Sequence, residues 1–176
     1  MRFVVHQHHA TGLHWDFRLE AEDGTLKSWA VPKGPSLDPG AKRLAMRTED
    51  HALDHIGFEG VIGQGHVGGG PVIIWDEGTY LNVTSDRRRG SADLPSLTVV
   101  DAVDAGHVSV ALSGHKLTGG FAITRTGTEP RERWILVKKR DAYADPSLDV
   151  VADRPESVRS GLRIDQLGQD RSGPAG

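Results

Sequence analysis

Polar and apolar side chains alternate strictly from His14 to Glu20. A period of two is typical of a β-strand with one buried face. Side chains two residues apart on a strand share a face and lie about 6.6 Å apart. The apolar face should therefore pack into a core, while the other face presents His14, Asp16 and Arg18 in a row. An arginine in such a row suits an anionic ligand, because its planar fork binds phosphate or carboxylate oxygens.

A second group of imidazoles precedes this strand. His8 is separated from it by the short turn Ala10-Thr11-Gly12, so the two segments can pair as a hairpin. His6 has the same strand parity as His8 and should share its face. Two imidazoles and one carboxylate suit Mn, Fe or Zn with positions left open for water or substrate. We therefore predict that His8, His14 and Asp16 hold a metal ion.

A third cluster follows further along the chain. Arg43, Arg47, Glu49 and His51 have the same parity and would line one face of a continuous strand. A histidine can act as a general acid or base near neutral pH, and arginines beside it suit developing negative charge. The alternative is a solvated, charged edge strand. Because the cluster of His8, His14 and Asp16 already indicates a site, the functional interpretation of these residues is as plausible as the solvated edge strand.

Many short strand-like segments, separated by turns rich in Gly and Pro, predict a mainly β fold. We expect one compact β-barrel domain over residues 1–145, with short flanking helices. The remaining residues, 146–176, should form a tail with a short helix from Pro155 to near Leu167 and a disordered end. Residues 86–104, which open with the basic run Arg87–Arg89, should form an irregular excursion. The strands are expected at Phe3–His6, His14–Ala21, Leu26–Ala30, Gly70–Trp75, His107–Leu112, Gly120–Arg125 and Trp134–Lys139.

Composition excludes several classes of protein. The chain has no cysteine, so disulfides, thiolate metal sites and cysteine nucleophiles are unavailable. It has no apolar run near the ~20 residues of a membrane span and no signal-peptide pattern, so we expect a cytoplasmic protein without a membrane partner. The net charge of −3 does not favour tight non-specific nucleic-acid binding. It leaves room for a local basic patch or for a bound metal cation.

Specific motifs give the chain a family resemblance over about residues 2–144. They are His8-His9-Ala10, Leu13–Glu20, Leu26–Ser36, Glu49-Asp50-His51, Phe58–Ile62, Val72–Asp76, Leu112–Leu117 and Trp134–Lys139. Together they resemble the 3′-phosphoesterase domain of bacterial ATP-dependent DNA ligase D, in a stand-alone form without ligase or polymerase modules. The run Trp29–Ser36 is highly specific.

The resemblance implies a compact, Mn²⁺-dependent β-barrel enzyme that removes 3′-phosphates and 3′-ribonucleosides from DNA ends during repair by end joining. Zn²⁺ or Co²⁺ are other candidate metals. The implied partners are DNA or RNA-terminated DNA 3′ ends, with separate ligase, polymerase and end-binding repair proteins. The residue roles that it implies are metal ligation by His8, His14 and Asp16, contact with the phosphate by Arg18, His51 and His55, and further contributions to activity by Arg43 and Glu49.

Three positions depart from the family pattern. His6 stands where Gln is common, Gly12 where Arg is frequent, and His55 where a Tyr usually contacts the phosphate. The chain as given also lacks an N-terminal extension that helps nucleoside removal in the full ligases. We therefore expect 3′-phosphate hydrolysis to exceed ribonucleoside removal, and we expect His55 to serve as a phosphate donor best when protonated.

Two other functions fit the same residues. His14 and Asp16 with a distal histidine also match a 2-His-1-carboxylate iron oxygenase, which iron-dependent oxygen uptake would reveal. The second alternative is a non-catalytic module that binds DNA ends or partner proteins. Such a module would not hydrolyse a 3′-phosphate oligonucleotide.

Overall fold

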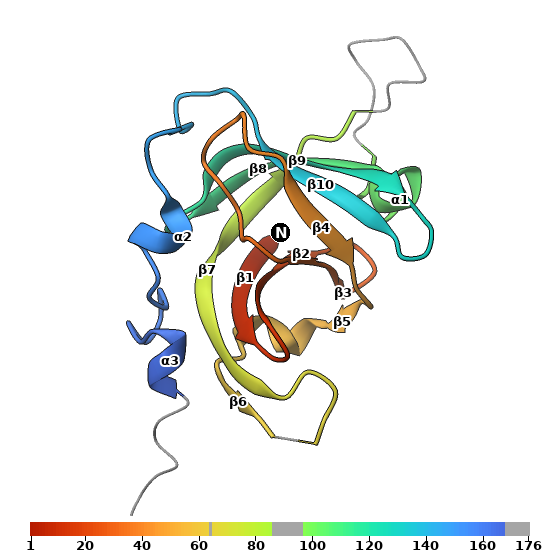
Figure 1. Ribbon diagram of the computed structural model, residues 1–176. Coiled ribbons are helices and arrows are strands. Elements are labelled where there is room, and N and C mark those ends of the chain that lie inside the picture. The colour runs from red at the N-terminus through yellow and green to blue at the C-terminus, as the bar shows by residue number, and fades with distance from the viewer. Residues whose placement is uncertain (64, 86–96, 168–176) are drawn as a thin grey trace, which may run out of the picture.

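The structure is a computed structural model that describes residues 1–63, 65–85 and 97–167. Figure 1 labels its elements in chain order. Their bounds are β1 (Arg2–His9), β2 (Leu13–Glu20), β3 (Thr25–Val31), β4 (Arg43–Arg47), β5 (His51–Ala52), the 3-10 helix η1 (Leu53–Gly57), β6 (Gly60–Ile62), β7 (Gly70–Asn82), α1 (Val99–Ala105), β8 (His107–Gly114), β9 (Thr118–Gly127), β10 (Arg133–Lys138), α2 (Val150–Asp153) and α3 (Ile164–Leu167).

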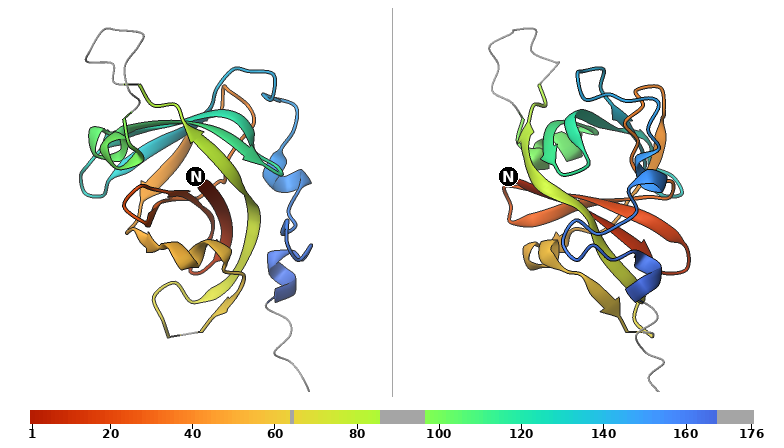
Figure 2. Two further views of the ribbon diagram at one scale, coloured as in Figure 1. Left: turned by 180° about the vertical axis from the view of Figure 1, so that it is seen from behind. Right: turned by 90° about the vertical axis from the view of Figure 1, so that its left-hand side faces the viewer.

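The strands of the described chain form one antiparallel sheet in the order β1-β2-β3-β4-β10-β9-β8-β7-β6, with β5 paired to β3. Pairing of β1 with β7 closes eight of these strands into a barrel (Figures 1 and 2). The prediction of a mainly β barrel with short helices is confirmed. None of the helices in the described ranges has the length and hydropathy of a membrane-spanning segment.

The apolar face of β2 fills the barrel core, as the alternation predicts. Phe17 and Leu19 are fully buried, and the core also contains Trp29 and Trp134, whose rings meet edge to face at 5.4 Å. Burial of each large apolar side chain contributes about 1.5–3 kcal/mol. The core thus fixes one face of β2 and leaves the other face to the polar row.

Strands β1, β2 and β3 curl tightly around one side of the barrel (Figure 1). The short strand β5 pairs with β3, and the 3-10 helix η1 leads from it to β6. Strand β6 pairs with β7, which itself pairs with β1. These connections close the open side of the curl and bring residues 51–62 opposite the hairpin of β1 and β2.

The segment predicted as an irregular excursion differs in its described part. Residues from Val99 to Ala105 form the helix α1, because Val99, Ala102 and Val103 are spaced to bury one face against the core. Thr98 begins the helix by accepting a hydrogen bond from the amide of Asp101. The basic run at residues 87–89 lies outside the described residues.

The predicted helix from Pro155 to Leu167 is wrong over its first part. Only Ile164–Leu167 is helical there, and a separate short helix, Val150–Asp153, precedes it. Between them the backbone hydrogen bonds to the barrel instead, since the amide of Val158 donates to the carbonyl of Ile74 at 3.0 Å. Residues 168–176, the predicted disordered end, lie outside the described residues.

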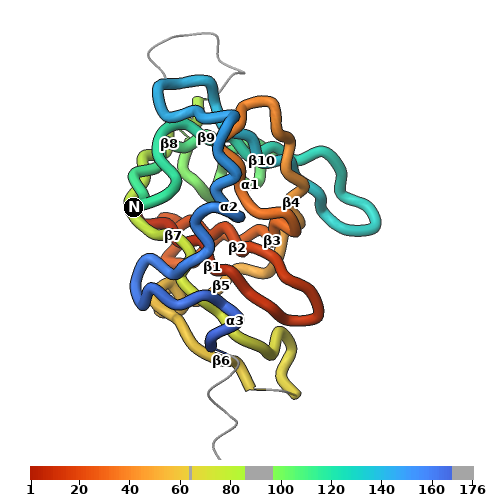
Figure 3. The backbone as a smooth tube through the Cα atoms, turned by 60° about the vertical axis from the view of Figure 1, so that its left-hand side comes forward, coloured from red at the N-terminus to blue at the C-terminus, as the bar shows by residue number. Residues whose placement is uncertain are grey.

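The segment after residue 145 packs along the barrel (Figure 3). The indole of Trp75 donates to the carbonyl of Arg154 at 2.9 Å, and Ser157 donates to the carboxylate of Glu59 at 2.6 Å. Val150 is 1% exposed. The predicted boundary at residue 145 therefore separates the barrel from a segment that supplies it with hydrogen-bond partners and apolar cover.

Removing residues 146–176 should lower the free energy of unfolding by several kcal/mol. Each buried polar group left without its hydrogen-bond partner costs about 1–3 kcal/mol, and loss of the Val150 contact adds about 1.5–3 kcal/mol. Urea unfolding of residues 1–145 and of residues 1–167 measures the difference. Equal midpoints and slopes for the two chains would contradict this expectation.

Candidate metal centre

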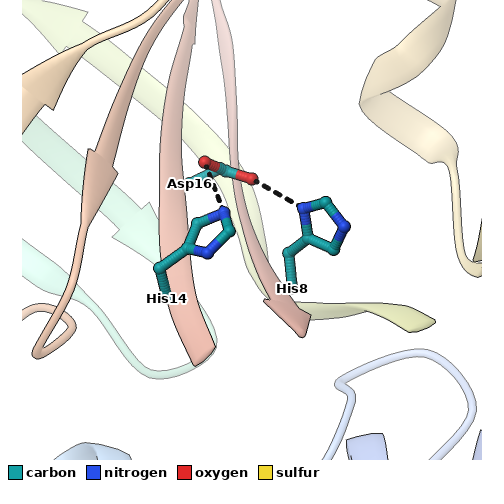
Figure 4. Close-up of side chains that lie close together, drawn as sticks. All are labelled: His8, His14 and Asp16. Carbon is teal, nitrogen blue, oxygen red and sulfur yellow. Dashed lines mark ion pairs between the residues drawn. The ribbon is translucent and has the colours of Figure 1, made fainter. Parts of the chain in front are cut away.

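The hairpin of β1 and β2 brings the three predicted metal ligands together. In its register His8 pairs with His14, and Asp16 follows on the same face. One ligand atom from each of the three side chains lies within 4.8 Å of the other two. Figure 4 shows the Asp16 carboxylate between the imidazoles, with Oδ1 3.4 Å from Nε2 of His14 and Oδ2 3.7 Å from Nδ1 of His8.

The donor atoms of this cluster fit a divalent metal ion. Both carboxylate–imidazole distances exceed the usual length of a hydrogen bond, so the ligand atoms converge without satisfying one another. Nδ1 of His14 lies 3.0 Å from the carbonyl of Gly12, which favours a proton on Nδ1 and a free lone pair on Nε2. Nε2 of His8 is buried with no hydrogen-bond partner in the described chain. Two imidazoles and a carboxylate are also the ligands that Mn, Fe and Zn accept.

Asp16 is ionised in this setting. Burial alone would raise its pKa, but the adjacent imidazoles of His14 and His8 and the charge of Arg18 outweigh burial and hold the pKa well below its usual range. The adjacent Asp16 carboxylate raises the pKa of His14. The carboxylate is thus available as an anionic ligand at neutral pH.

Arg18 is buried beside this cluster and fixed on several sides. It is 4% exposed. Nη2 donates to Asp16 at 3.1 Å, and Nε donates to Nδ1 of His6 at 3.1 Å. Nη1 lies 3.0 Å from the hydroxyl of Ser28 and 2.9 Å from Nδ1 of His51. These contacts hold a permanent positive charge next to the candidate metal ligands.

A cleft with a volume of about 510 Å³ lies over Arg18 and the metal cluster. His51, on β5, and His55, on η1, enter it from the opposite side, with ring centroids 5.1 Å apart. The His55 ring stacks on Phe58 and lies 5.2 Å from the His6 ring. The residues that line the cleft are His8, Ala10, His14, Asp16, Arg18, Thr48, Glu49, His51, His55, Ile62, Val67, Gly68 and Val72.

Both imidazoles on the far side of the cleft favour the neutral form. Burial and the charge of Arg18 lower the pKa of His55 to about 4. The same two causes, in the same order, lower the pKa of His51. At neutral pH, His55 is therefore an uncharged ring, which differs from the protonated donor expected from the sequence.

Strand β4 does not continue to His51, so the alternation of its side chains does not extend to that residue. It ends at Arg47, whose guanidinium lies 5.1 Å from the ring centroid of buried Trp29, on the core side of the sheet. Arg43 has the same strand parity as fully buried Ala45 and does not line the cleft. The expectation that one face carries both arginines together with Glu49 and His51 is therefore wrong. The role of Arg43 in activity stays a prediction, and it would be exerted from outside the cleft.

Ser28 is a site residue that the sequence did not single out. Its hydroxyl contacts Arg18, and it is fully buried. Ser28 pairs with Arg18 across β2 and β3. A polar residue within the run Leu26–Ala30 was the available signal, but the register that places it opposite Arg18 depends on the pairing of two strands.

The fold and the cluster together define a β-barrel protein with a candidate centre for a divalent metal. The model of the DNA ligase D 3′-phosphoesterase domain family matches residues 6–125. The chain therefore belongs to this family, and the resemblance found in its motifs is confirmed.

Several curated proteins are similar to the chain. It is 46% identical to the multifunctional non-homologous end joining protein LigD of Pseudomonas aeruginosa over 163 residues, which are 91% of this chain and 18% of that protein. It is 41% identical to LigD of Mycobacterium tuberculosis over 133 residues, 76% of this chain and 15% of that protein. For LigD of Mycolicibacterium smegmatis the identity is 36% over 142 residues, 80% of this chain and 17% of that protein. The chain thus spans less than a fifth of the length of these relatives.

Proposed function

We propose that this chain is a metal-dependent phosphoesterase that processes the 3′ ends of DNA in end joining. The observation that carries the proposal is the convergence of two imidazoles, a carboxylate and a buried arginine in one cleft. Membership of the 3′-phosphoesterase family supports the same reaction. Ligase, polymerase and end-binding repair proteins are the proposed partners, because the relatives are named as multifunctional end-joining proteins.

His8, His14 and Asp16 would hold the metal, for which we propose Mn²⁺, with Zn²⁺ or Co²⁺ compatible with the same donors. A divalent ion in this position supplies charge neutralisation for non-bridging phosphate oxygens and lowers the pKa of water. Asp16 contributes a negative charge to the ligand set. His14 is oriented for this role by its contact with the Gly12 carbonyl.

Arg18 would contact the phosphate with the part of its guanidinium that the protein leaves free. A guanidinium has five N–H donors, and the contacts with His6, Asp16, Ser28 and His51 engage four of them. One N–H on Nη2 remains for a phosphate oxygen. Because the charge is already in place before substrate binds, it stabilises added negative charge without reorganisation.

His51 would donate a hydrogen bond to the phosphate. Its Nδ1 lies 2.9 Å from Nη1 of Arg18, which can only donate, and 2.9 Å from the carbonyl oxygen of Glu49, which can only accept. We propose the tautomer in which Nδ1 accepts from Arg18 and Nε2 carries the proton. The lowered pKa favours this neutral ring. We therefore assign His51 a phosphate contact and not the protonation of the leaving oxygen. His55 is proposed as a second neutral donor, and Glu49 as a contributor at the rim of the cleft.

A gel assay on primer–templates with a 3′-phosphate or a single 3′-ribonucleotide tests this function. We expect Mn²⁺-dependent removal of the 3′-phosphate, faster than removal of the ribonucleoside. The residues proposed to bind the phosphate are all present. Ribonucleoside removal also requires the sugar to be positioned, which can account for several kcal/mol of a barrier. His6, Gly12 and His55 replace the usual family residues, so we expect the sugar to be positioned less well. Equal or faster ribonucleoside removal would contradict the predicted preference.

The same assay separates the two other functions. No turnover of either primer with any of the three metals, combined with binding to DNA ends, would favour a non-catalytic module. Oxygen uptake that depends on added iron would favour the iron oxygenase.

A further inference from the structure

A cluster of cations without carboxylate partners lies beside the candidate metal centre. Lys33, Lys42 and Arg43 line a depression of about 290 Å³ together with Pro32 and Leu44. Within the described ranges none of these three cations has an ion pair or a side-chain hydrogen bond, and Nε of Arg43 is buried without a partner. The chain as a whole has a net charge of −3. A local group of unpaired cations is therefore a candidate contact for an anion.

The strand register places this depression close to the metal ligands. Trp15, the neighbour of His14, pairs with Val31 at the end of β3, and Pro32 and Lys33 follow directly along the chain. One strand further along the sheet, β4, which begins at Arg43, pairs with β3. Neighbouring strands lie about 4.8 Å apart, so the depression begins within about 10 Å of His14.

Packing fixes the loop that presents Lys33. Gly34 adopts φ 73°, and a Cβ at this position would lie 2.6 Å from Val151 and 2.9 Å from Trp15. Further along the loop, the carbonyl of Leu37 accepts a hydrogen bond from the amide of Asp145. Figure 3 shows the loop between β3 and β4 beside α2. A cation on a fixed loop loses little backbone entropy when it binds.

The depression that adjoins the cleft at the hairpin turn carries no such charge. It is bordered by Ala10 and Thr11 of the hairpin turn and by residues 65–69 of the glycine-rich loop. Lysine and arginine are absent from the described residues that line it. A polynucleotide that leaves the cleft has a phosphate at every nucleotide, so the two depressions differ strongly in the electrostatic free energy that they offer it.

We infer that the depression formed by Lys33, Lys42 and Arg43 binds backbone phosphates of the DNA strand whose 3′ end lies in the metal-centred cleft. This inference rests on the proposed function, because it extends the same substrate away from its reacting end. Because a strand carries one phosphate per nucleotide, a distance of about 10 Å reaches phosphates within the first few nucleotides from the end. Pro32 and Leu44, which is 44% exposed, give apolar contact to the sugars between them. Arg43 thereby acquires a place in substrate binding although it lies outside the cleft.

The double variant Lys33→Gln/Lys42→Gln tests this surface. The probe is a fluorescein-labelled DNA strand of about 12 nucleotides with a 3′-hydroxyl, compared by anisotropy with one of about two nucleotides, between roughly 50 and 200 mM NaCl. The wild type should bind the longer strand more tightly. The double variant should bind it about 10-fold more weakly, and the slope of log K against log salt should fall by roughly 0.7 for each lost phosphate contact.

Arg2→Gln is the matched control for loss of a surface cation. Arg2 precedes His8 by six residues along β1, which corresponds to about 20 Å, and it is exposed. It should leave both the affinity and the salt slope unchanged. Thermal unfolding of each variant verifies that the fold is intact.

Two results would overturn the inference. One is wild-type affinity and salt slope in the lysine double variant, and the other is equal affinity of the wild type for the short and the long strand. The probe ends in a 3′-hydroxyl and is not hydrolysed, so the measurement does not depend on turnover. Length-dependent binding without any hydrolysis of a 3′-phosphate would instead contradict the proposed enzyme while leaving the surface in place.

Discussion

Asp16→Asn and His14→Ala are each expected to abolish Mn²⁺-dependent turnover and to reduce the amount of bound metal. Each change removes or neutralises one of only three protein ligands in the predicted set. Charge stabilisation by a metal is worth several kcal/mol, so the rate should fall by roughly 10³-fold or more. Elemental analysis of the protein after Mn²⁺ loading measures the metal, and hydrolysis of a 3′-phosphate primer measures the rate.

The two variants carry different risks for the fold. Asp16 is buried against Arg18, and removal of one partner of a buried ion pair costs about 3–5 kcal/mol. Asparagine keeps the shape and an oxygen acceptor, and His14 is only partly buried. His9→Ala is the matched control, because His9 is exposed and adjoins His8 on the same strand. Wild-type metal stoichiometry in both site variants would contradict the predicted ligand set.

The sequence predicted this part of the site well because its geometry is local. Residues on one strand alternate by necessity, and a three-residue turn makes β2 a direct neighbour of β1. His8, His14 and Asp16 could therefore be placed together from spacing alone. The barrel was likewise readable from many short strands between Gly and Pro turns.

The rest of the site depends on contacts between distant segments. His51 reaches Arg18 only because β5 pairs with β3, where Leu26 lies opposite His51. The parity of Arg43 and Arg47 gave no information about His51, because alternation holds only within a continuous strand and β4 ends before it. The surroundings of Arg18 require three strands in register, so the sequence identified the arginine but not its contact with Ser28.

The second large effect is expected at Arg18. Arg18→Ala should retain metal at saturating Mn²⁺ but lose about 2–4 kcal/mol of transition-state stabilisation, which corresponds to roughly 30- to 1000-fold in kcat/KM. Arg18→Lys should restore only part of this loss. A lysine keeps the charge, but its single nitrogen cannot replace contacts made by three separate nitrogens of the guanidinium. His51→Ala should give a smaller loss, since it removes one neutral donor.

Arg47→Lys serves as the matched control for the Arg18 variants. Arg47 also binds through a guanidinium, to the carbonyl of Ser28 at 3.0 Å and to Asp50 at 2.5 Å, but it does not line the cleft. Its replacement should lower stability while leaving kcat/KM near that of the wild type. Arg18 is buried, so its replacement could lower kcat/KM by destabilising the barrel. A loss caused by destabilisation should appear in the Arg47 variant as well, whereas a loss of phosphate contact should appear only in the Arg18 variants. Full activity of Arg18→Lys on a 3′-phosphate primer would mean that Arg18 acts only as a point charge. Full activity of Arg18→Ala would remove it from the reaction altogether.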